Sequence, residues 1–136
     1  MPHQPLTILI ADDDIEDMEL LEDALVAIEP GVKLHKLLSA KSVMEHLNQL
    51  TDDMLPCLFI LDYNMPELNG SELLSLISSQ PRYRSIPKII LSTSSAPLHI
   101  HECMRNGATE YFVKPDNVKD LDILARKMLA FCKPVE

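Results

Sequence analysis

Two short, almost wholly apolar runs that each end in aspartate constrain the fold of this chain most strongly. Residues 6–11 (LTILIA) precede Asp12, and residues 57–61 (CLFIL) precede Asp62. A strand with one solvated face alternates apolar and polar residues, whereas a run without alternation is typical of a strand covered on both faces. These runs therefore predict central strands of a parallel sheet that lies between helices.

The rest of the chain alternates strand-like runs with segments of helical period. Further strands are predicted at residues 32–38, 88–91 and 110–113, and helices at residues 15–28, in the segment after Ser42, and at residues 71–80, 97–105 and 118–132. Five strand–helix units predict an α/β fold with helices on both faces of one parallel sheet. No linker or repeat interrupts the pattern, so we expect one domain over residues 5–134.

Charge argues against nucleic acid and membrane surfaces as partners. The 136 residues carry a formal net charge of −9, and residues 1–62 contain 13 of the 21 acidic residues but only 3 of the 12 basic ones. A surface that binds phosphate backbones or anionic lipids needs a basic face. We therefore expect no direct DNA binding and no membrane association.

The three cysteines, Cys57, Cys103 and Cys132, are widely spaced and form no metal-ligand pattern. We interpret them as buried thiols in a reducing cytoplasm. The chain also opens without a cationic segment followed by an apolar stretch and a cleavage site, so a cytoplasmic location is expected.

Polar side chains follow four of the predicted strands at the points where they end. Asp12 and Asp13 follow the first strand, Asp62 the third, and Ser92 and Lys114 the last two. The carboxyl ends of parallel strands share one edge of a sheet, which is where such sheets bind ligands. This convergence of charged and hydroxyl groups is the main functional signal in the sequence.

Three crowded carboxylates repel one another unless cations neutralise them. Lys114 supplies one positive charge, and oxygen ligands of this kind suit Mg²⁺. Carboxylates, Mg²⁺, a lysine and a hydroxyl together favour phosphoryl transfer, in which an attacked carboxylate becomes an acyl phosphate. Asp14, the last aspartate of its run, is instead expected to cap the following helix.

Four segments resemble, in this order, the receiver domain of two-component response regulators: residues 8–14 (ILIADDD), 61–66 (LDYNMP) with Gly70, 91–94 (LSTS) and 113–115 (VKP). The resemblance implies a flavodoxin-like three-layer sandwich with five helices and a five-stranded parallel sheet of order 2-1-3-4-5. The loop at residues 81–87 is similar to that of stand-alone receivers found beside phytochrome-type kinases. Because no effector region follows in this sequence, we expect a single-domain response regulator with no output domain.

The resemblance implies a magnesium-dependent phosphoacceptor site. Asp62 matches the aspartate that accepts the phosphoryl group, and Asp12 and Asp13 match the acidic pair that binds the metal. Asn64 matches the residue whose backbone carbonyl completes the metal shell. Asp62 itself is also expected among the ligands of Mg²⁺.

The same resemblance assigns roles around the phosphoryl group. Ser92 matches the hydroxyl that reaches the phosphoryl group, and Lys114 the lysine that pairs with it. The bond between Lys114 and Pro115 resembles a cis peptide of the family, a form that proline makes accessible. Tyr111 matches the aromatic residue that turns inward when Ser92 moves.

The implied partners are a sensor histidine kinase or phosphotransfer protein and a downstream protein target, and a homodimer through the last strand–helix units stays open. The only chemistry implied is self-catalysed phosphoryl transfer to Asp62 and slow autodephosphorylation, so no enzyme in the usual sense is expected.

One alternative function is that of an aspartate-nucleophile phosphohydrolase, which would need an acid where Asn64 stands. The other is a receiver-like binding module that is never phosphorylated, although every expected ionisable group is present.

Overall fold

The computed structural model describes residues 6–132, so residues 5, 133 and 134 of the expected domain lie outside the described part. The strands are β1 (Thr7–Ala11), β2 (Lys33–Leu37), β3 (Leu58–Asp62), β4 (Lys88–Ser92) and β5 (Glu110–Val113). The helices are α1 (Ile15–Ile28), α2 (Ala40–Asn48), α3 (Gly70–Ser78), α4 (Pro97–Arg105) and α5 (Val118–Ala130).

The five strands form one parallel sheet in the order β2-β1-β3-β4-β5, which confirms the expected flavodoxin-like order. β1 pairs with β3 so that Ala11 lies opposite Leu61. The strand order reverses between these two neighbours, so the residues that follow β1 and end β3 meet at one edge. This register brings Asp12 and Asp62 to the same end of the sheet.

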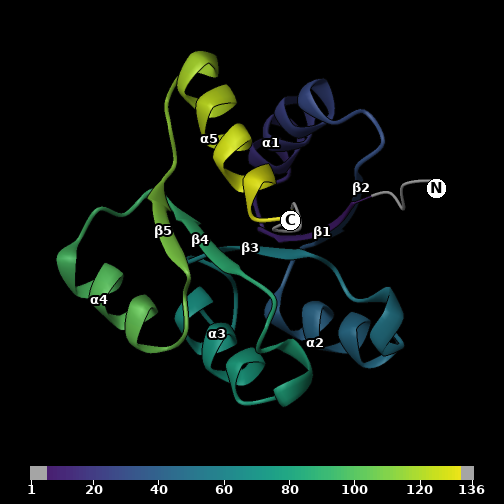
Figure 1. The fold of residues 1–136 in the computed structure, drawn as a ribbon. Coiled ribbons are helices and arrows are strands. Elements are labelled where there is room, and N and C mark those ends of the chain that lie inside the picture. The colour runs from purple at the N-terminus through teal and green to yellow at the C-terminus, as the bar shows by residue number, and fades with distance from the viewer. Residues whose placement is uncertain (1–5, 133–136) are drawn as a thin grey trace.

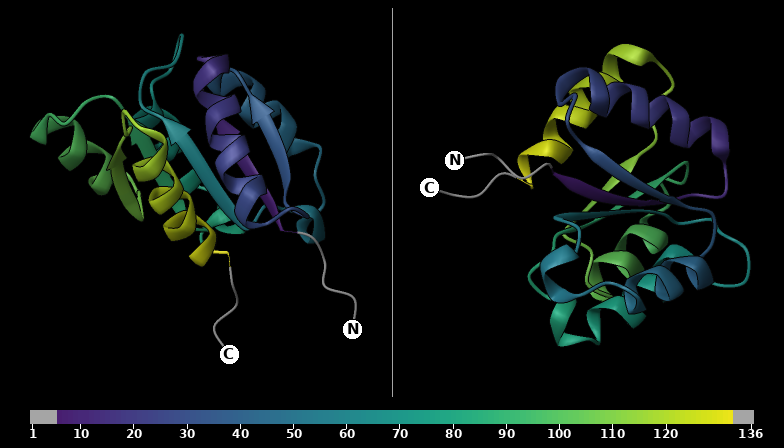
Figure 2. Two further views of the ribbon diagram at one scale, coloured as in Figure 1. Left: turned by 90° about the horizontal axis from the view of Figure 1, so that it is seen from above. Right: turned by 90° about the vertical axis from the view of Figure 1, so that its right-hand side faces the viewer.

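Helices cover both faces of the sheet, with α1 and α5 on one side and α2, α3 and α4 on the other (Figures 1 and 2). Alternation along β1 divides the core between these layers. Ile8 and Ile10 belong to the cluster beneath α1 and α5, whereas Leu9 and Ala11 belong to the cluster above α2 and α3. Both faces of β1 are therefore apolar, as its sequence predicts.

Local capping groups set where the helices begin. Asp14 caps α1 as expected, since its side chain accepts a hydrogen bond from the Asp17 amide. α2 begins earlier than expected, because Ser39 and not Ser42 is its N-cap and forms a reciprocal capping box. α3 is capped by Asn69 and starts at Gly70, one residue before the expected start.

The interpretation of all three cysteines as thiols is wrong for two of them. Cys57, just before β3, and Cys132, just after α5, form a disulfide with their Cα atoms 5.2 Å apart. The two residues are 75 positions apart in the chain, so only the packing of α5 against the sheet brings them together. Cys103 is a free, buried thiol, as expected.

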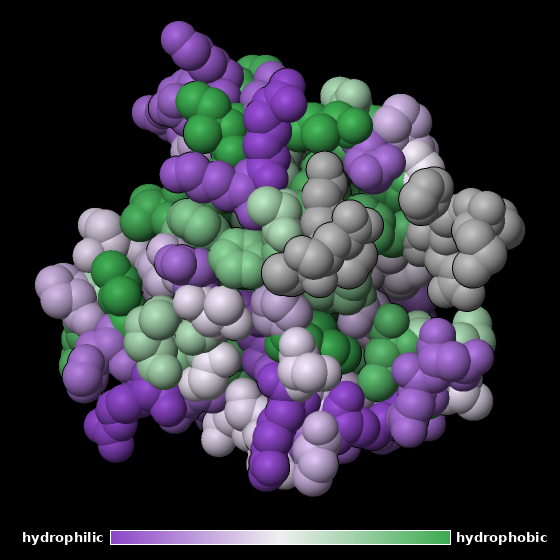
Figure 3. Space-filling view, viewed as in Figure 1, coloured by the Kyte–Doolittle hydropathy of each residue, from purple (hydrophilic) through white to green (hydrophobic). Residues whose placement is uncertain are grey.

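The described residues include no helix long and apolar enough to cross a membrane. On the face shown in Figure 3, hydrophobic residues are interspersed with hydrophilic ones. Exposed apolar side chains occur on both α1 and α5, among them Leu20 and Ile123.

Candidate functional site

Three carboxylates meet at the carboxyl edge of β1 and β3. One oxygen of each of Asp12, Asp13 and Asp62 can be chosen so that all three lie within 4.8 Å of one another. Asp12 and Asp62 are each only 5% exposed, whereas Asp13 is open to solvent beside a surface hollow of about 510 Å³ lined by residues 13–16. The group thus combines two buried carboxylates with one that solvent can reach.

Lys114 supplies the balancing positive charge from the end of β5. Its Nζ atom lies 2.9 Å from Asp12 Oδ2 and 3.6 Å from Asp62 Oδ2. A third carboxylate, Asp17 in the first turn of α1, accepts a hydrogen bond of 2.8 Å from the same nitrogen. One ammonium therefore holds carboxylates from β1, β3 and α1.

Burial and charge change the acidity of this cluster. Burial, followed by the nearby charge of Asp12, raises the pKa of Asp62 to about 7, although Lys114 opposes the rise. Burial by itself would lower the pKa of Lys114, but its hydrogen bonds to Asp17 and Asp12 outweigh this and raise it. Lys114 therefore stays positively charged. A further cation beside Asp62 would favour the ionised form of the Asp62 carboxylate.

The remaining predicted residues surround the carboxylates at the same edge. Ser92 is fully buried at the end of β4, and its Oγ accepts a hydrogen bond of 3.1 Å from the Ser94 amide. The Asn64 amide donates a long hydrogen bond of 3.4 Å to Asp62 Oδ1. Tyr111 of β5 donates from its hydroxyl to the Ser94 carbonyl at 2.7 Å. Their roles in phosphoryl transfer stay predictions.

Gly70 allows the chain after β3 to fold back onto the phosphoacceptor candidate. Its amide donates to the Tyr63 carbonyl at 2.7 Å. A Cβ at this position would lie 2.5 Å from the Asp62 carbonyl oxygen, closer than any side chain tolerates. Glycine is therefore required for the close approach of α3 to this loop.

The expected cis peptide is wrong. The described residues contain no cis peptide bond, so the bond between Lys114 and Pro115 is trans. The trans form is the lower-energy isomer even before proline. Lys114 reaches Asp12 and Asp62 with this bond in the trans form.

Sequence reasoning missed two features of the site. Asp17 was hidden among the many acidic residues of α1, although its position three residues after the N-cap Asp14 places it in the first turn, at the sheet edge. Tyr63 directly follows Asp62, is 8% exposed, and bonds Glu102 of α4 from its hydroxyl. Nothing in the sequence indicates that Tyr63 and Glu102, which are 39 positions apart, form a hydrogen bond.

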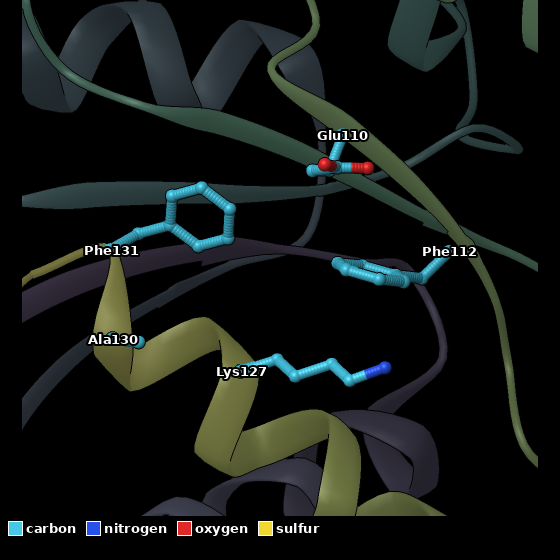
Figure 4. Close-up of a pocket in the computed structure, with 5 residues that line it drawn as sticks. All are labelled: Glu110, Phe112, Lys127, Ala130 and Phe131. Carbon is cyan, nitrogen blue, oxygen red and sulfur yellow. The ribbon is translucent and has the colours of Figure 1, made fainter.

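A separate hollow of about 500 Å³ lies between β5 and α5, away from the carboxylates. Figure 4 shows the rings of Phe112 and Phe131 and the side chain of Lys127 around it, with Glu110 at its rim. It offers no cluster of acids or nucleophiles, so the chemistry belongs to the carboxylate edge and this hollow is a surface feature of another kind.

Comparison with known proteins agrees with this geometry. The family model described as "Response regulator receiver domain" matches residues 8–126. Two-component response regulator ORR13 from Oryza sativa subsp. japonica is 31% identical over 114 residues, which cover 84% of this chain and 90% of that protein. Two-component response regulator ARR8 from Arabidopsis thaliana is 28% identical, and the match covers 90% of this chain but only 60% of ARR8.

Solved structures give the same result. The phosphorylated cyanobacterial phytochrome response regulator RcpA superposes with a TM-score of 0.85 at 25% identity, over 94% of each chain. The Mn²⁺-bound form of response regulator Rcp1 superposes with a TM-score of 0.82 at 26% identity, over 97% of this chain and 98% of that one. Fold, strand-end residues and sequence similarity together show that this chain belongs to the receiver domain family of two-component response regulators.

Proposed function

We propose that the receiver domain of this chain accepts a phosphoryl group on Asp62 in a Mg²⁺-dependent reaction. The observation that carries this proposal is the charge arrangement around Asp62. Oxygens of Asp12, Asp13 and Asp62 gather within 4.8 Å, and Lys114 Nζ lies 3.6 Å from Asp62. Such a site favours attack by one carboxylate while the others and the lysine hold charge in place.

The proposed donor is the phosphohistidine of a sensor histidine kinase or phosphotransfer protein. An Asp62 oxygen donates an electron pair to phosphorus, the P–N bond breaks, and its electron pair returns to the imidazole nitrogen. Asp62 becomes an acyl phosphate. Lys114 would neutralise a phosphoryl oxygen, and the hydroxyl of Ser92 would donate a hydrogen bond to another.

The donor set fits a hard divalent cation. Carboxylates of Asp12, Asp13 and Asp62 and the carbonyl of Asn64 would supply oxygen ligands, which Mg²⁺ prefers. When bound, Mg²⁺ would offset the charge of the carboxylates and the phosphoryl oxygens. The similar protein Rcp1 has a Mn²⁺-bound form, which supports the proposal that this chain also binds a divalent cation.

Phosphorylation would then change a surface that a downstream protein reads. We assign this switch to Ser92 and Tyr111, because Tyr111 is bonded to the segment after β4 that also contacts Ser92. The hollow between β5 and α5 is a candidate part of the surface, for a target or for a second copy of the chain. The proposed kinase partner implies a cytoplasmic location.

Intact-mass measurement tests the proposal directly. The protein is incubated with Mg²⁺ and a small acyl phosphate or phosphoramidate, and the expected result is the gain of one acid-labile phosphoryl group. Asp62→Asn should gain none. No gain in the wild type would support the unphosphorylated binding module instead, and continuous release of inorganic phosphate from a small phosphoester would support the hydrolase.

A further inference from the structure

Ser94, two residues after β4, has a partner for each of its polar groups. Its amide donates to Ser92 Oγ at 3.1 Å, and its carbonyl accepts from the Tyr111 hydroxyl at 2.7 Å. Its Oγ lies 2.7 Å from His99 Nδ1 and accepts from the Ala96 amide at 3.2 Å. Ser94 therefore links the hydroxyl proposed to contact the phosphoryl group with both β5 and α4.

His99 extends this connection to the residue that follows Asp62. Its ring stacks on Tyr63 with the centroids 4.5 Å apart and the ring planes 21° from parallel. One turn further along α4, Glu102 accepts a hydrogen bond of 3.0 Å from the Tyr63 hydroxyl. His99 thus contacts the ends of both β3 and β4, through Tyr63 and Ser94 respectively.

These polar contacts matter because α4 has little apolar anchorage. Of the residues of α4, all of which the structure describes, Cys103 alone is buried. Leu98 is 74% exposed, and the N-cap residue Ala96 offers no side-chain hydrogen bond to the helix. The position of α4 therefore depends on polar contacts: those of His99 and Glu102 within the helix, and that of its C-cap Asn106, whose side chain donates to Ser71 Oγ at 2.7 Å.

We propose that His99 is a positioning residue that couples the state of Asp62 to the position of α4, an inference that rests on the proposed function. If Ser92 turns toward a phosphoryl group on Asp62, its hydrogen bond with the Ser94 amide must lengthen or Ser94 must follow. Movement of Ser94 separates its Oγ from His99, and a hydrogen bond of 2.7 Å is lost once the atoms part by about 1 Å. The stacked Tyr63 keeps the other side of His99 fixed to β3.

The test compares amide hydrogen exchange in α4 with and without Mg²⁺ and beryllofluoride, a phosphoryl mimic. In the wild type, exchange in α4 should change by about fivefold or more, the lower end of ordinary allosteric coupling. His99→Phe keeps a ring on Tyr63 but removes the bond to Ser94, and we expect the change to fall to about twofold or less. His99→Asn retains an amide near the Nδ1 position and should recover part of the response.

His101→Phe is the matched control, since His101 is an exposed histidine of the same helix. It should respond like the wild type. Ser94→Ala removes the same contact from the other side and should reproduce the loss seen in His99→Phe, which keeps the test decisive if one variant folds poorly. Phosphorylated mass is measured for the wild type in parallel.

Two results would overturn the inference in distinguishable ways. If the change in α4 hydrogen exchange is equal in His99→Phe, Ser94→Ala and His101→Phe while the wild type is phosphorylated normally, the role of His99 is rejected and the proposed function stands. A wild type that gains no phosphoryl group on Asp62 would reject the proposed function and the coupling with it.

Discussion

Lys114 approaches Asp17 more closely than it approaches either strand-end carboxylate: its Nζ lies 2.8 Å from Asp17 Oδ2, against 2.9 Å for Asp12 and 3.6 Å for Asp62. The lysine is therefore shared between the helix α1 and the sheet edge. Asp17 therefore competes with Asp62 for the positive charge of Lys114, although Asp17 is not one of the three clustered carboxylates.

This sharing predicts different effects for two neighbouring aspartates. Asp13→Asn should lower Mg²⁺ affinity by about tenfold or more, as expected for loss of a ligand. It should also leave thermal stability equal or slightly higher, because one of three repelling charges is removed. Asp17→Asn should alter Mg²⁺ affinity by less than about threefold and lower stability by about 1 kcal/mol or less, since Asp17 is partly exposed.

Calorimetric Mg²⁺ titration and thermal unfolding of both variants measure these effects. Unchanged Mg²⁺ affinity in Asp13→Asn would remove Asp13 from the metal site. A larger loss of Mg²⁺ affinity in Asp17→Asn than in Asp13→Asn would show that Asp17, and not Asp13, is the metal ligand.

A second prediction concerns the glycine behind Asp62. Gly70→Ala should destabilise the protein by about 1–3 kcal/mol, because the new Cβ would lie 2.5 Å from the Asp62 carbonyl oxygen and 2.9 Å from the Tyr63 Cα. It should also slow phosphorylation of Asp62, since the loop must move. Chemical denaturation and the intact-mass assay measure the two effects.

Gly31→Ala is the control for that substitution. Nothing lies within 4 Å of a Cβ at Gly31, so the change should be neutral or stabilise by about 0.4–1 kcal/mol. Equal stability of the two variants would contradict the close approach at Gly70.

The disulfide predicts a stability that depends on reducing agent. The bridge joins residues 75 positions apart, and opening so long a loop should lower the free energy of unfolding by about 2–4 kcal/mol. Guanidinium denaturation with and without a thiol reductant measures the difference. A Cys57→Ala/Cys132→Ala double variant should be insensitive to reductant.

Alkylation under denaturing, non-reducing conditions provides an independent check on the same bridge. Cys103 is the free cysteine and should be labelled alone. Labelling of Cys57 and Cys132 as well would show that the bridge is not formed in the purified protein.

The fourth prediction is a pH dependence at the edge of the sheet. His35 Nδ1 lies 2.6 Å from His46 Nε2, and burial, followed by the charges of His46 and Lys33, lowers the pKa of His35 below 6.5. The folded state therefore binds this proton more weakly than the unfolded state. The stability contribution of His35 is present in full above pH 6.5 and is lost as pH falls through the lower folded pKa.

Thermal unfolding measured from about pH 8 to about pH 5 should reveal the contribution of His35 as a difference in stability between variants. The wild type should lose stability on acidification relative to His35→Gln, in which the titrating group is absent. His101→Gln, on an exposed histidine, should follow the wild type. Parallel curves for the wild type and His35→Gln would contradict the lowered pKa.

The sequence alone predicted the fold and the residues of the carboxylate edge. Runs such as residues 57–61 are apolar at every position, and this pattern is typical of a strand covered on both faces. Parallel strands place their carboxyl ends together, so Asp12, Asp62 and Lys114 could be brought to one edge without coordinates. The predicted helix bounds at residues 15–28 and 97–105 agree with α1 and α4.

Only the tertiary structure decided which side chains meet across those elements. The bridge between Cys57 and Cys132, the shared lysine of Asp17 and the stack of Tyr63 on His99 each join distant positions. Periodicity assigns a residue to a face of its own helix or strand, but it carries no information about which neighbour occupies the facing position. Those pairings depend on how the helices pack on the sheet, and therefore on the whole chain at once.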